Sequence, residues 1–230
     1  MSSDQVAEDL PTRILHVATE LFTSNGFGTT TVRDIVEITQ SNVAAVNYHF
    51  GSKDALIREV AINLLSPVQK ERQRMLSVAL REHDAGHQIT AEKIIRAFVY
   101  PLVYAARSRD GGRLVVRLLM QMWVEPGLSL HTFVMREYNR NARKFINAFQ
   151  ICLPHLDVPN IVWRYEAMRG TVIHLLNDCD PRTSKLQLLS KDTLNPNKIS
   201  DEDLLDYLIL TVDTIITGKG MILKKDPDKS

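Results

Sequence analysis

Apolar side chains recur every three to four residues along most of this 230-residue chain, and no other feature constrains its fold as strongly. In the first clear case Ile14, Ala18 and Phe22 share one helical face. Asn25-Gly26 then supplies a left-handed stop signal. No segment alternates apolar and polar residues as a strand would, and no repeat of about 20 to 50 residues is present. The sequence therefore predicts an all-α fold.

Capping residues, glycines and prolines divide this pattern into about nine helices. Pro67 either kinks the long helix that begins at Lys53 or starts a new one, because proline fits at a first helical position. Residues 180–199 show little periodicity and predict a mobile loop, and residues 219–230 predict a polar tail. The expected helices are a segment of about four turns after Pro11-Thr12, a short one from Val32, Val43–Phe50, the long one from Lys53, Ala91–Arg107, Arg113–Val124, Ser129–Leu153, Pro159–Asn177 and Asp201–Thr217.

The composition of the chain excludes several classes of protein. Apolar residues make up 44% of the chain and charged residues 24%, which is an ordinary globular composition. The net charge of +1 neither favours nor excludes a polyanionic partner. Cys152 and Cys179 lie far apart, the N-terminus is acidic, and no apolar run reaches membrane-spanning length. We therefore expect a soluble, cytoplasmic protein without disulfides, leader peptide or membrane helix.

Residues 30–50 predict a helix-turn-helix unit. Thr31 and Asp34 have capping-box spacing at the start of the first short helix, and Asn42 is a cap for the second. In such a unit the second helix enters the major groove of DNA, while the first crosses the backbone. Residues 12–60, however, hold four Lys and Arg against five Asp and Glu, so no basic patch accompanies the unit. From periodicity alone, a helical bundle with a polar face is the alternative.

Three ordered blocks of sequence resemble the N-terminal domain of the tetracycline-repressor (TetR) family of bacterial regulators. They are Arg13–Phe22, Asn25–Ile35 and Asn47–Leu56, so that the resemblance covers about residues 10–60. It implies a homodimeric transcription factor that binds a double-stranded DNA operator through residues 1–53. It also implies that residues 54–218 form a domain for dimerisation and for a small effector, followed by the tail. Repression, relieved by the effector, is the habit of this family.

The resemblance also assigns DNA contacts residue by residue. The phosphate contacts fall on Thr30 or Thr31, Tyr48, His49 and Lys53. The base contacts fall on Val43, Ala44, Ala45 and Asn47. Because these base-reading residues are small and mostly apolar, we expect readout through methyl contacts, water or DNA shape. In this family the turn between the two helices usually has an Ala-Gly-Val character, whereas here it is Thr39-Gln40-Ser41. Gln40 therefore occupies a position that often needs a positive φ.

Large apolar and sulfur-containing side chains gather between residues 90 and 180. Such side chains usually form a core, but Met beside aromatic rings also suits an apolar effector cavity. Arg113 and Arg117 form either a solvated edge or a grip on a carboxylate or phosphate head group. Residues 113–119 and Glu125-Pro126 resemble the branch that includes regulators of fatty-acid metabolism, which suggests an acyl chain or acyl-CoA as effector. The candidate ligand residues are Phe98, Tyr104, Arg113, Arg117, Met120, Trp123 and Phe149.

Two helices near the C-terminal end carry apolar stripes that fit either subunit pairing or burial within one subunit. The resemblance implies that they pack against their symmetry mates as a four-helix bundle around a two-fold axis. Such an axis would hold two recognition helices about 34 to 36 Å apart, which is one turn of DNA. The candidate interface residues are Tyr165, Arg169, Val172, Leu205, Leu208, Ile209 and Val212.

An enzyme or a metalloprotein is the weaker interpretation of this sequence. His83 and His87 have helical spacing, but they stand in a Gly-containing region with no third ligand at metal spacing. No catalytic triad, phosphate-binding loop or paired-carboxylate motif stands out from chance spacing. We therefore expect no catalytic site, metal or cofactor. A further alternative keeps the DNA-binding unit and makes the C-terminal domain a surface for a protein partner.

Overall fold

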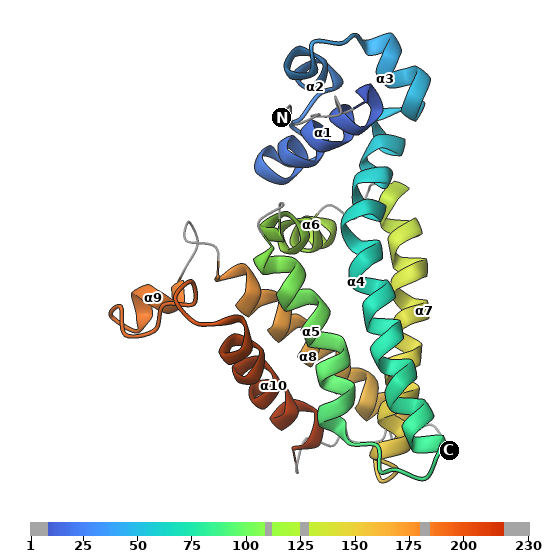
Figure 1. Cartoon of the computed structure of the whole chain (residues 1–230), viewed down its shortest axis with the longest axis vertical. Helices are drawn as coiled ribbons and strands as arrows, with labels where there is room; N and C mark the ends of the chain where they lie inside the picture. Colours follow the sequence, from blue (N-terminus) through green and yellow to red (C-terminus); the bar gives the residue numbers. More distant parts are fainter. Residues whose placement is uncertain (1–8, 109–111, 125–128, 180–184, 219–230) are drawn as a thin grey trace, which may run out of the picture.

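The computed structural model describes residues 9–108, 112–124, 129–179 and 185–218, with side chains for all of these except 112–113, 121–124 and 129–137. None of the described residues lies in a strand, which confirms the all-α prediction (Figure 1). The helices are α1 (Leu10–Asn25), α2 (Val32–Thr39), α3 (Val43–Phe50), α4 (Lys53–Asp84), α5 (Ala91–Arg107), α6 (Gly112–Val124), α7 (Ser129–Cys152), α8 (Val158–Asn177), α9 (Lys185–Leu189) and α10 (Asp201–Thr217). We call α1–α3 the head and α5–α10 the body.

Most helix boundaries follow the signals in the sequence. Asp9 caps α1, and its side chain accepts a hydrogen bond from the Thr12 N–H at 3.0 Å, so the helix begins slightly earlier than expected. The helix α4 continues through Pro67, so the alternative of a new helix at this proline is wrong. The segment expected to be a loop contains the five-residue helix α9, which is too short to leave a periodic pattern.

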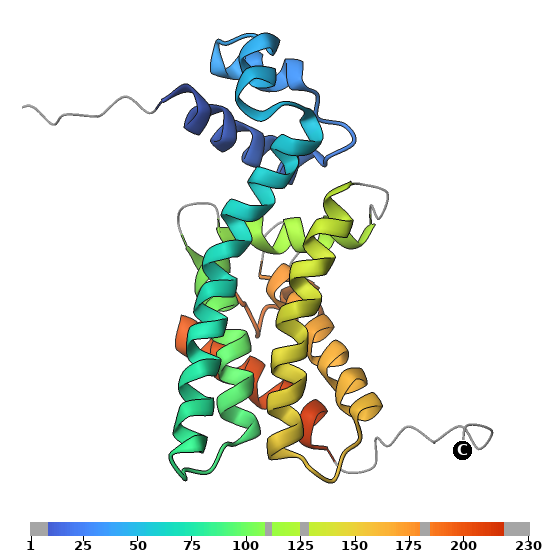
Figure 2. The ribbon, with the colours of Figure 1, turned by 90° about the vertical axis from the view of Figure 1, so that its right-hand side faces the viewer.

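The head packs at one end of the molecule, on the first turns of α4 (Figures 1 and 2). The rings of Phe22 and Phe27 pack with centroids 5.6 Å apart, and Ile35 of α2 and Val46 of α3 are fully buried in the same core. Arg13 of α1 donates to the carbonyl oxygen at the end of α2 at 3.1 Å. Because each of the three helices contributes to this core, the direction of α3 is fixed by packing.

The helix α4 is the continuous element that joins the two parts. It has 32 residues, which corresponds to about 48 Å along its axis. Ser52 caps its start, because the serine hydroxyl accepts from the Ala55 N–H at 3.1 Å. Beyond the head it runs beside α5 and α7 (Figure 2).

The body is a helical layer structure with an aromatic core. α10 packs on α5 and α8, and α6 lies between α1 and α5, beneath the head (Figure 1). The Phe98 ring contacts the rings of Phe145 and Tyr165 edge to face, with centroids 5.4 and 5.6 Å away. Within the described residues, no helix is both long and apolar enough to cross a membrane.

Candidate functional site

Local hydrogen bonds close the turn between α2 and α3. The Thr31 hydroxyl accepts from the Asp34 N–H at 3.3 Å, and the Asp34 carboxylate accepts from the Thr31 N–H at 2.7 Å, so the expected capping box is present. Asn42 caps α3 by accepting from the Ala45 N–H at 2.8 Å. Gln40 adopts the left-handed conformation, with φ 50° and ψ 44°. The chain therefore makes this turn without a glycine.

One continuous strip of side chains is exposed on α3. Val43 is 41% exposed and Tyr48 is 86% exposed, and Ala44 and Asn47 are exposed between them. Val46 is fully buried on the opposite side of the helix. The strip consists of two adjacent rows at i, i+4 spacing. The helix α3 that carries it lies in the head, at the end of the molecule away from the body (Figure 1). Its side chains are small at the N-terminal end, which leaves room for close approach of another surface. The remaining predicted base contact is the half-buried Ala45.

The residues expected at phosphates differ in where their side chains point. Thr31, Tyr48 and His49 are exposed. Thr30 is only 1% exposed, and its hydroxyl donates to the Leu21 carbonyl at 3.2 Å, so Thr31 alone of the pair offers a hydroxyl at the surface.

Lys53 is half-buried at the start of α4. Its Nζ donates to the Phe27 carbonyl at 2.5 Å, which ties the loop before α2 to α4. An ammonium group has three donors, so this contact leaves two for another acceptor.

Two carboxyl groups of the head are held in their charged forms. Hydrogen bonds from the N–H and the hydroxyl of Thr31 lower the pKa of Asp34, and the charge of Lys53 contributes less. Hydrogen bonds from Thr12 lower the pKa of Asp9, with a small contribution from His49. Both carboxylates serve helix N-termini, where the helix dipole favours negative charge. The head therefore mixes charges of both signs, as its sequence indicates.

The structure disperses the described side chains that were expected to bind an effector. Phe98 and Phe149 are buried in the core, and Met120 is half-buried against it. Tyr104 donates its hydroxyl hydrogen to a carboxylate of α10 at 3.0 Å, at the surface. The side chains of Arg113 and Trp123 lie outside the described residues.

Arg117 has a role that the sequence did not indicate. Its Nη1 donates to the Thr23 carbonyl at 3.3 Å. Thr23 lies in the last turn of α1, where carbonyl groups lack helical partners and favour a cation. Arg117 therefore links α6 of the body to α1 of the head.

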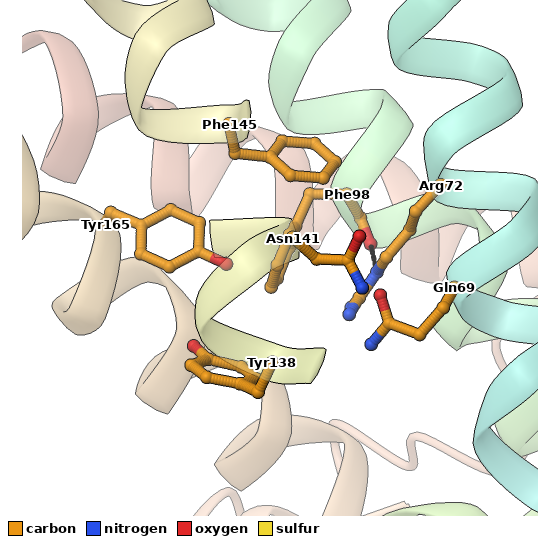
Figure 3. Close-up of a pocket in the computed structure, with 7 residues that line it drawn as sticks. All are labelled: Gln69, Arg72, Phe98, Tyr138, Asn141, Phe145 and Tyr165. Carbon is orange, nitrogen blue, oxygen red and sulfur yellow. Dashed lines mark hydrogen bonds between the residues drawn. The ribbon is translucent and has the colours of Figure 1, made fainter. Parts of the chain in front are cut away.

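A small pocket lies inside the body between α4, α5, α7 and α8 (Figure 3). Arg72 of α4 is 6% exposed, and its Nε donates to the Phe98 carbonyl at 2.8 Å. The guanidinium carbon lies 3.8 Å from the centroid of the Phe98 ring. Burial lowers the pKa of Arg72 to about 10. The lining residues are Gln69, Arg72, Phe98, Tyr138, Asn141, Phe145 and Tyr165.

Sequence reasoning missed Arg72 because it stands in the polar run 69–74, which is typical of an exposed helix face. A signal was nevertheless present. Val68 and Leu76 are buried one turn to either side, so Arg72 occupies the apolar register of α4. A lone cation in such a register is a candidate for function, since charged residues are rarely buried without a partner.

The residues predicted for the subunit interface are mostly covered within one chain, which corrects that prediction. α8 and α10 turn these side chains toward the core that they share with α5. Those at most 6% exposed are Tyr165, Val172, Leu205, Leu208, Ile209 and Val212. Arg169 pairs with Glu166 on its own helix. The exposed large apolar side chains of α8 and α10, which we call the exposed α8–α10 face, are instead Val158, Val162, Trp163, Tyr207 and Leu210.

Of the two histidines with helical spacing, His83 lies in the last turn of α4 and His87 in the loop between α4 and α5, and both face backbone atoms. Nδ1 of His83 is 3.3 Å from the His87 carbonyl oxygen, and Nδ1 of His87 is 3.2 Å from the Glu82 carbonyl oxygen. Across the described part of the chain, no group of three or more His, Cys, Asp or Glu side chains could hold a metal ion.

Two family profiles match this chain. The profile described as bacterial regulatory proteins, tetR family, matches residues 14–60. The profile described as tetracyclin repressor-like, C-terminal domain, matches residues 96–201. The first match contains the helix-turn-helix unit, and the second contains most of the body.

A curated relative and several solved structures are also similar. The HTH-type transcriptional regulator QacR of Staphylococcus aureus is 40% identical over 52 residues, which are 23% of this chain and only 28% of QacR. PfmR of Thermus thermophilus, a TetR family transcriptional regulator, superposes with a TM-score of 0.57 at 17% identity, over 96% of this chain and 100% of PfmR. The superantigen PfiT superposes with a TM-score of 0.53 at 18% identity, over 95% and 98% of the two chains. At such identities the structural likeness shows the fold alone.

Proposed function

The chain belongs to the TetR family of bacterial regulatory proteins, and from this premise we propose that it is a DNA-binding transcription regulator whose α3 enters the major groove. The observation that carries the proposal is the exposed strip of Val43, Ala44, Asn47 and Tyr48. Because buried Val46 holds the other side of α3 in the core, this strip can meet DNA without any loss of packing.

In this proposal the small residues of α3 contact bases and the polar residues around them contact phosphates. Val43, Ala44 and Ala45 allow close approach and contact with thymine methyl groups. Asn47 can donate and accept at a base edge. The phosphate contacts come from Thr31, Tyr48, His49 and Lys53. Because the head carries few cations, neutral donors and the exposed N-terminus of α2 have to supply part of the affinity.

We place the contact between two subunits on the exposed α8–α10 face. Trp163 is 59% exposed and Leu210 is 71% exposed in the single chain, and aromatic side chains such as Trp163 are enriched in the centres of interfaces. A two-fold axis through this face would present two copies of α3 about 34 to 36 Å apart. The expected operator is therefore an inverted repeat with half-sites one turn apart.

The proposed regulation acts through the elements that join body and head. An effector bound in the body would displace α4 or α6, of which the second holds α1 through Arg117. A small tilt would change the spacing of the two α3 helices on the operator. A coupling free energy of roughly 1 to 3 kcal/mol changes the affinity about 5- to 150-fold. We propose that the unliganded dimer represses and that the effector releases it.

Selection of bound fragments from random duplex DNA tests this function. We expect an inverted repeat whose binding falls steeply with salt. Asn47→Ala should change the preferred base at one position of each half-site. Lys53→Ala should weaken all sequences about equally and lower the salt slope by about one unit. Ser77→Ala, at an exposed position of α4 far from the head, is the control. If the folded protein enriches no sequence, the proposal is rejected.

A further inference from the structure

We propose that the pocket between α4, α5, α7 and α8 binds a compact organic carboxylate, whose anionic group pairs with Arg72 (Figure 3). The inference rests on the proposed function, because it names the chemical class of the effector. Two observations carry it. They are a buried cation with no counter-ion among the described residues and a buried amide oxygen with no donor, both in the same small space.

Arg72 is a costly residue to bury in the unliganded chain. It lies between the buried Val68 and Leu76 on the face of α4 that packs in the body. A guanidinium in such a position loses most of its hydration, and removal from water disfavours a charge that has no partner. The Phe98 ring 3.8 Å away offsets part of this cost by cation–π attraction. An anion in the pocket would offset much more of it.

The guanidinium also has more donors than the described protein atoms satisfy. Its one hydrogen bond among these residues runs from Nε to the Phe98 carbonyl at 2.8 Å. Of the carboxylates next to the lining residues in sequence, the two whose side chains are described bond elsewhere, since Glu71 accepts from Arg74 at the surface and Glu166 accepts from Arg169. The side chain of Glu137, next to Tyr138, lies outside the described residues. The two terminal nitrogens form a planar fork whose geometry matches a carboxylate.

A second polar group of the pocket lacks a partner as well. Oε1 of Gln69, one turn before Arg72, is buried and accepts no hydrogen bond from the residues that the structure describes. Asn141 on the facing helix is already engaged, because its Oδ1 accepts from Gln73 at 2.5 Å. The Gln69 amide can present either its oxygen or its nitrogen, so it fits a carboxylate oxygen or a hydroxyl group beside it. A buried group of this kind calls for a partner that the described part of the chain does not supply.

The remaining walls favour a ligand with an apolar part of limited size. Phe98, Phe145 and Tyr165 supply aromatic rings in mutual contact. The space between the lining atoms does not admit even a water-sized sphere, so any ligand has to move the lining side chains apart as it binds. The long acyl chain that the sequence suggests would have to spread the helices. A compact carboxylate requires less rearrangement.

Thermal unfolding and calorimetric titration of the full-length protein without DNA test the inference. The probes are sodium benzoate and sodium hexanoate, with benzamide and hexanamide as neutral matches and sodium phosphate as an inorganic anion. We expect a saturable rise in Tm with at least one carboxylate and none with its amide, because binding to the folded state alone stabilises it. Arg72→Met should abolish the rise. Arg74→Met, which removes an exposed cation of the same helix, should preserve it.

The inference is overturned if neither carboxylate gives a saturable rise, if an amide matches its carboxylate, or if Arg72→Met retains the rise. A rise with phosphate alone overturns the organic class. Should Arg72→Met not fold, Arg72→Lys keeps the charge and loses the fork, and we expect about tenfold weaker carboxylate binding. Unchanged affinity in that variant contradicts a role for the fork.

The DNA selection is independent of these measurements, so the two failures can be told apart. Carboxylate binding by a protein that enriches no DNA sequence would reject the regulator and keep the pocket. Enriched DNA without carboxylate binding would reject the pocket and keep the regulator.

Discussion

Gln40 determines much of the direction in which α3 projects. Its backbone has φ 50° and ψ 44°. For a residue with a Cβ atom, this left-handed conformation costs about 1 to 2 kcal/mol of conformational energy. Its N–H bonds to the carbonyl groups of Glu37 and Val36, and the Ser41 N–H bonds to the Val36 carbonyl at 3.0 Å. These bonds keep the strained residue in place. A glycine would adopt the same conformation without the steric cost.

Gln40→Gly should therefore stabilise the protein. We expect the free energy of unfolding to rise by about 0.5 to 1 kcal/mol. Glycine relieves the strain of the folded turn, and the greater freedom that it gives the unfolded chain offsets part of this gain. This corresponds to a rise in Tm of roughly 1 to 4 °C in calorimetry. Gln40→Ala keeps the Cβ atom and should give no rise. A lower Tm for the glycine variant would show that the left-handed turn is not the one adopted in solution.

Residues that depend on near neighbours could be predicted from the sequence, and those that depend on distant ones could not. The capping box of Thr31 and Asp34 follows from a spacing of three residues. The inward hydroxyl of Thr30 depends on a carbonyl of α1. The burial of Arg72 depends on Phe98, 26 positions away, and no local pattern contains that contact.

At the scale of the element, the start of α2 depends on a charged cap. The pKa of Asp34 is lowered by hydrogen bonds from Thr31, so the folded state favours the charged carboxylate. The stabilisation is complete above the ordinary carboxyl pKa of 3.8 and disappears as the pH falls through the lower folded-state value. The start of α2 is therefore more stable near neutral pH than in acid.

Asp34→Ala should accordingly lower Tm at neutral pH and have a smaller effect in acid. The two melting curves should converge as the pH is taken from about 7 to below about 3, because the wild-type carboxyl then becomes protonated and loses its advantage. Thermal melts followed by circular dichroism measure this difference. Glu37→Ala controls for the loss of an exposed carboxylate from the same helix. A gap between wild type and Asp34→Ala that widens in acid would contradict the charged cap.

The helices α8 and α10 show why the pairing surface could not be read from periodicity. On α10 the buried side chains include Leu208 and Val212, while Tyr207 and Leu210 are exposed beside them. A helix with two apolar faces gives one broad stripe in the sequence. The larger aliphatic set was assigned to the interface, whereas in the structure it fills the core of a single chain. The order of the nine expected helices survives this error, because it depends on caps and glycines, whereas α9 was not expected.

At the scale of the whole molecule, the head is connected to the body by α4 and by the contact of α6 with α1. Arg117→Met removes the hydrogen bond to the Thr23 carbonyl. We expect the free energy of unfolding to fall by about 1 kcal/mol and amide exchange in the last turn of α1 to become faster, because that helix end loses its cationic partner. Hydrogen exchange followed by mass spectrometry measures the exchange rate in α1. Arg96→Met, which breaks an exposed ion pair within the body, is the control. Unchanged exchange in α1 would remove Arg117 from the route between effector and DNA.

Two neighbouring leucines of α10 provide a matched test of the proposed subunit contact. Leu210 is 71% exposed and Leu208 is 2% exposed in the single chain. Leu210→Glu should leave each subunit folded but place a charge in the subunit contact, so light scattering should report a monomer with little affinity for the inverted repeat. Leu208→Glu should instead unfold the chain, because it buries a carboxylate in the core. An intact dimer of Leu210→Glu would move the pairing surface elsewhere, and with it the axis that sets the spacing of the two α3 helices.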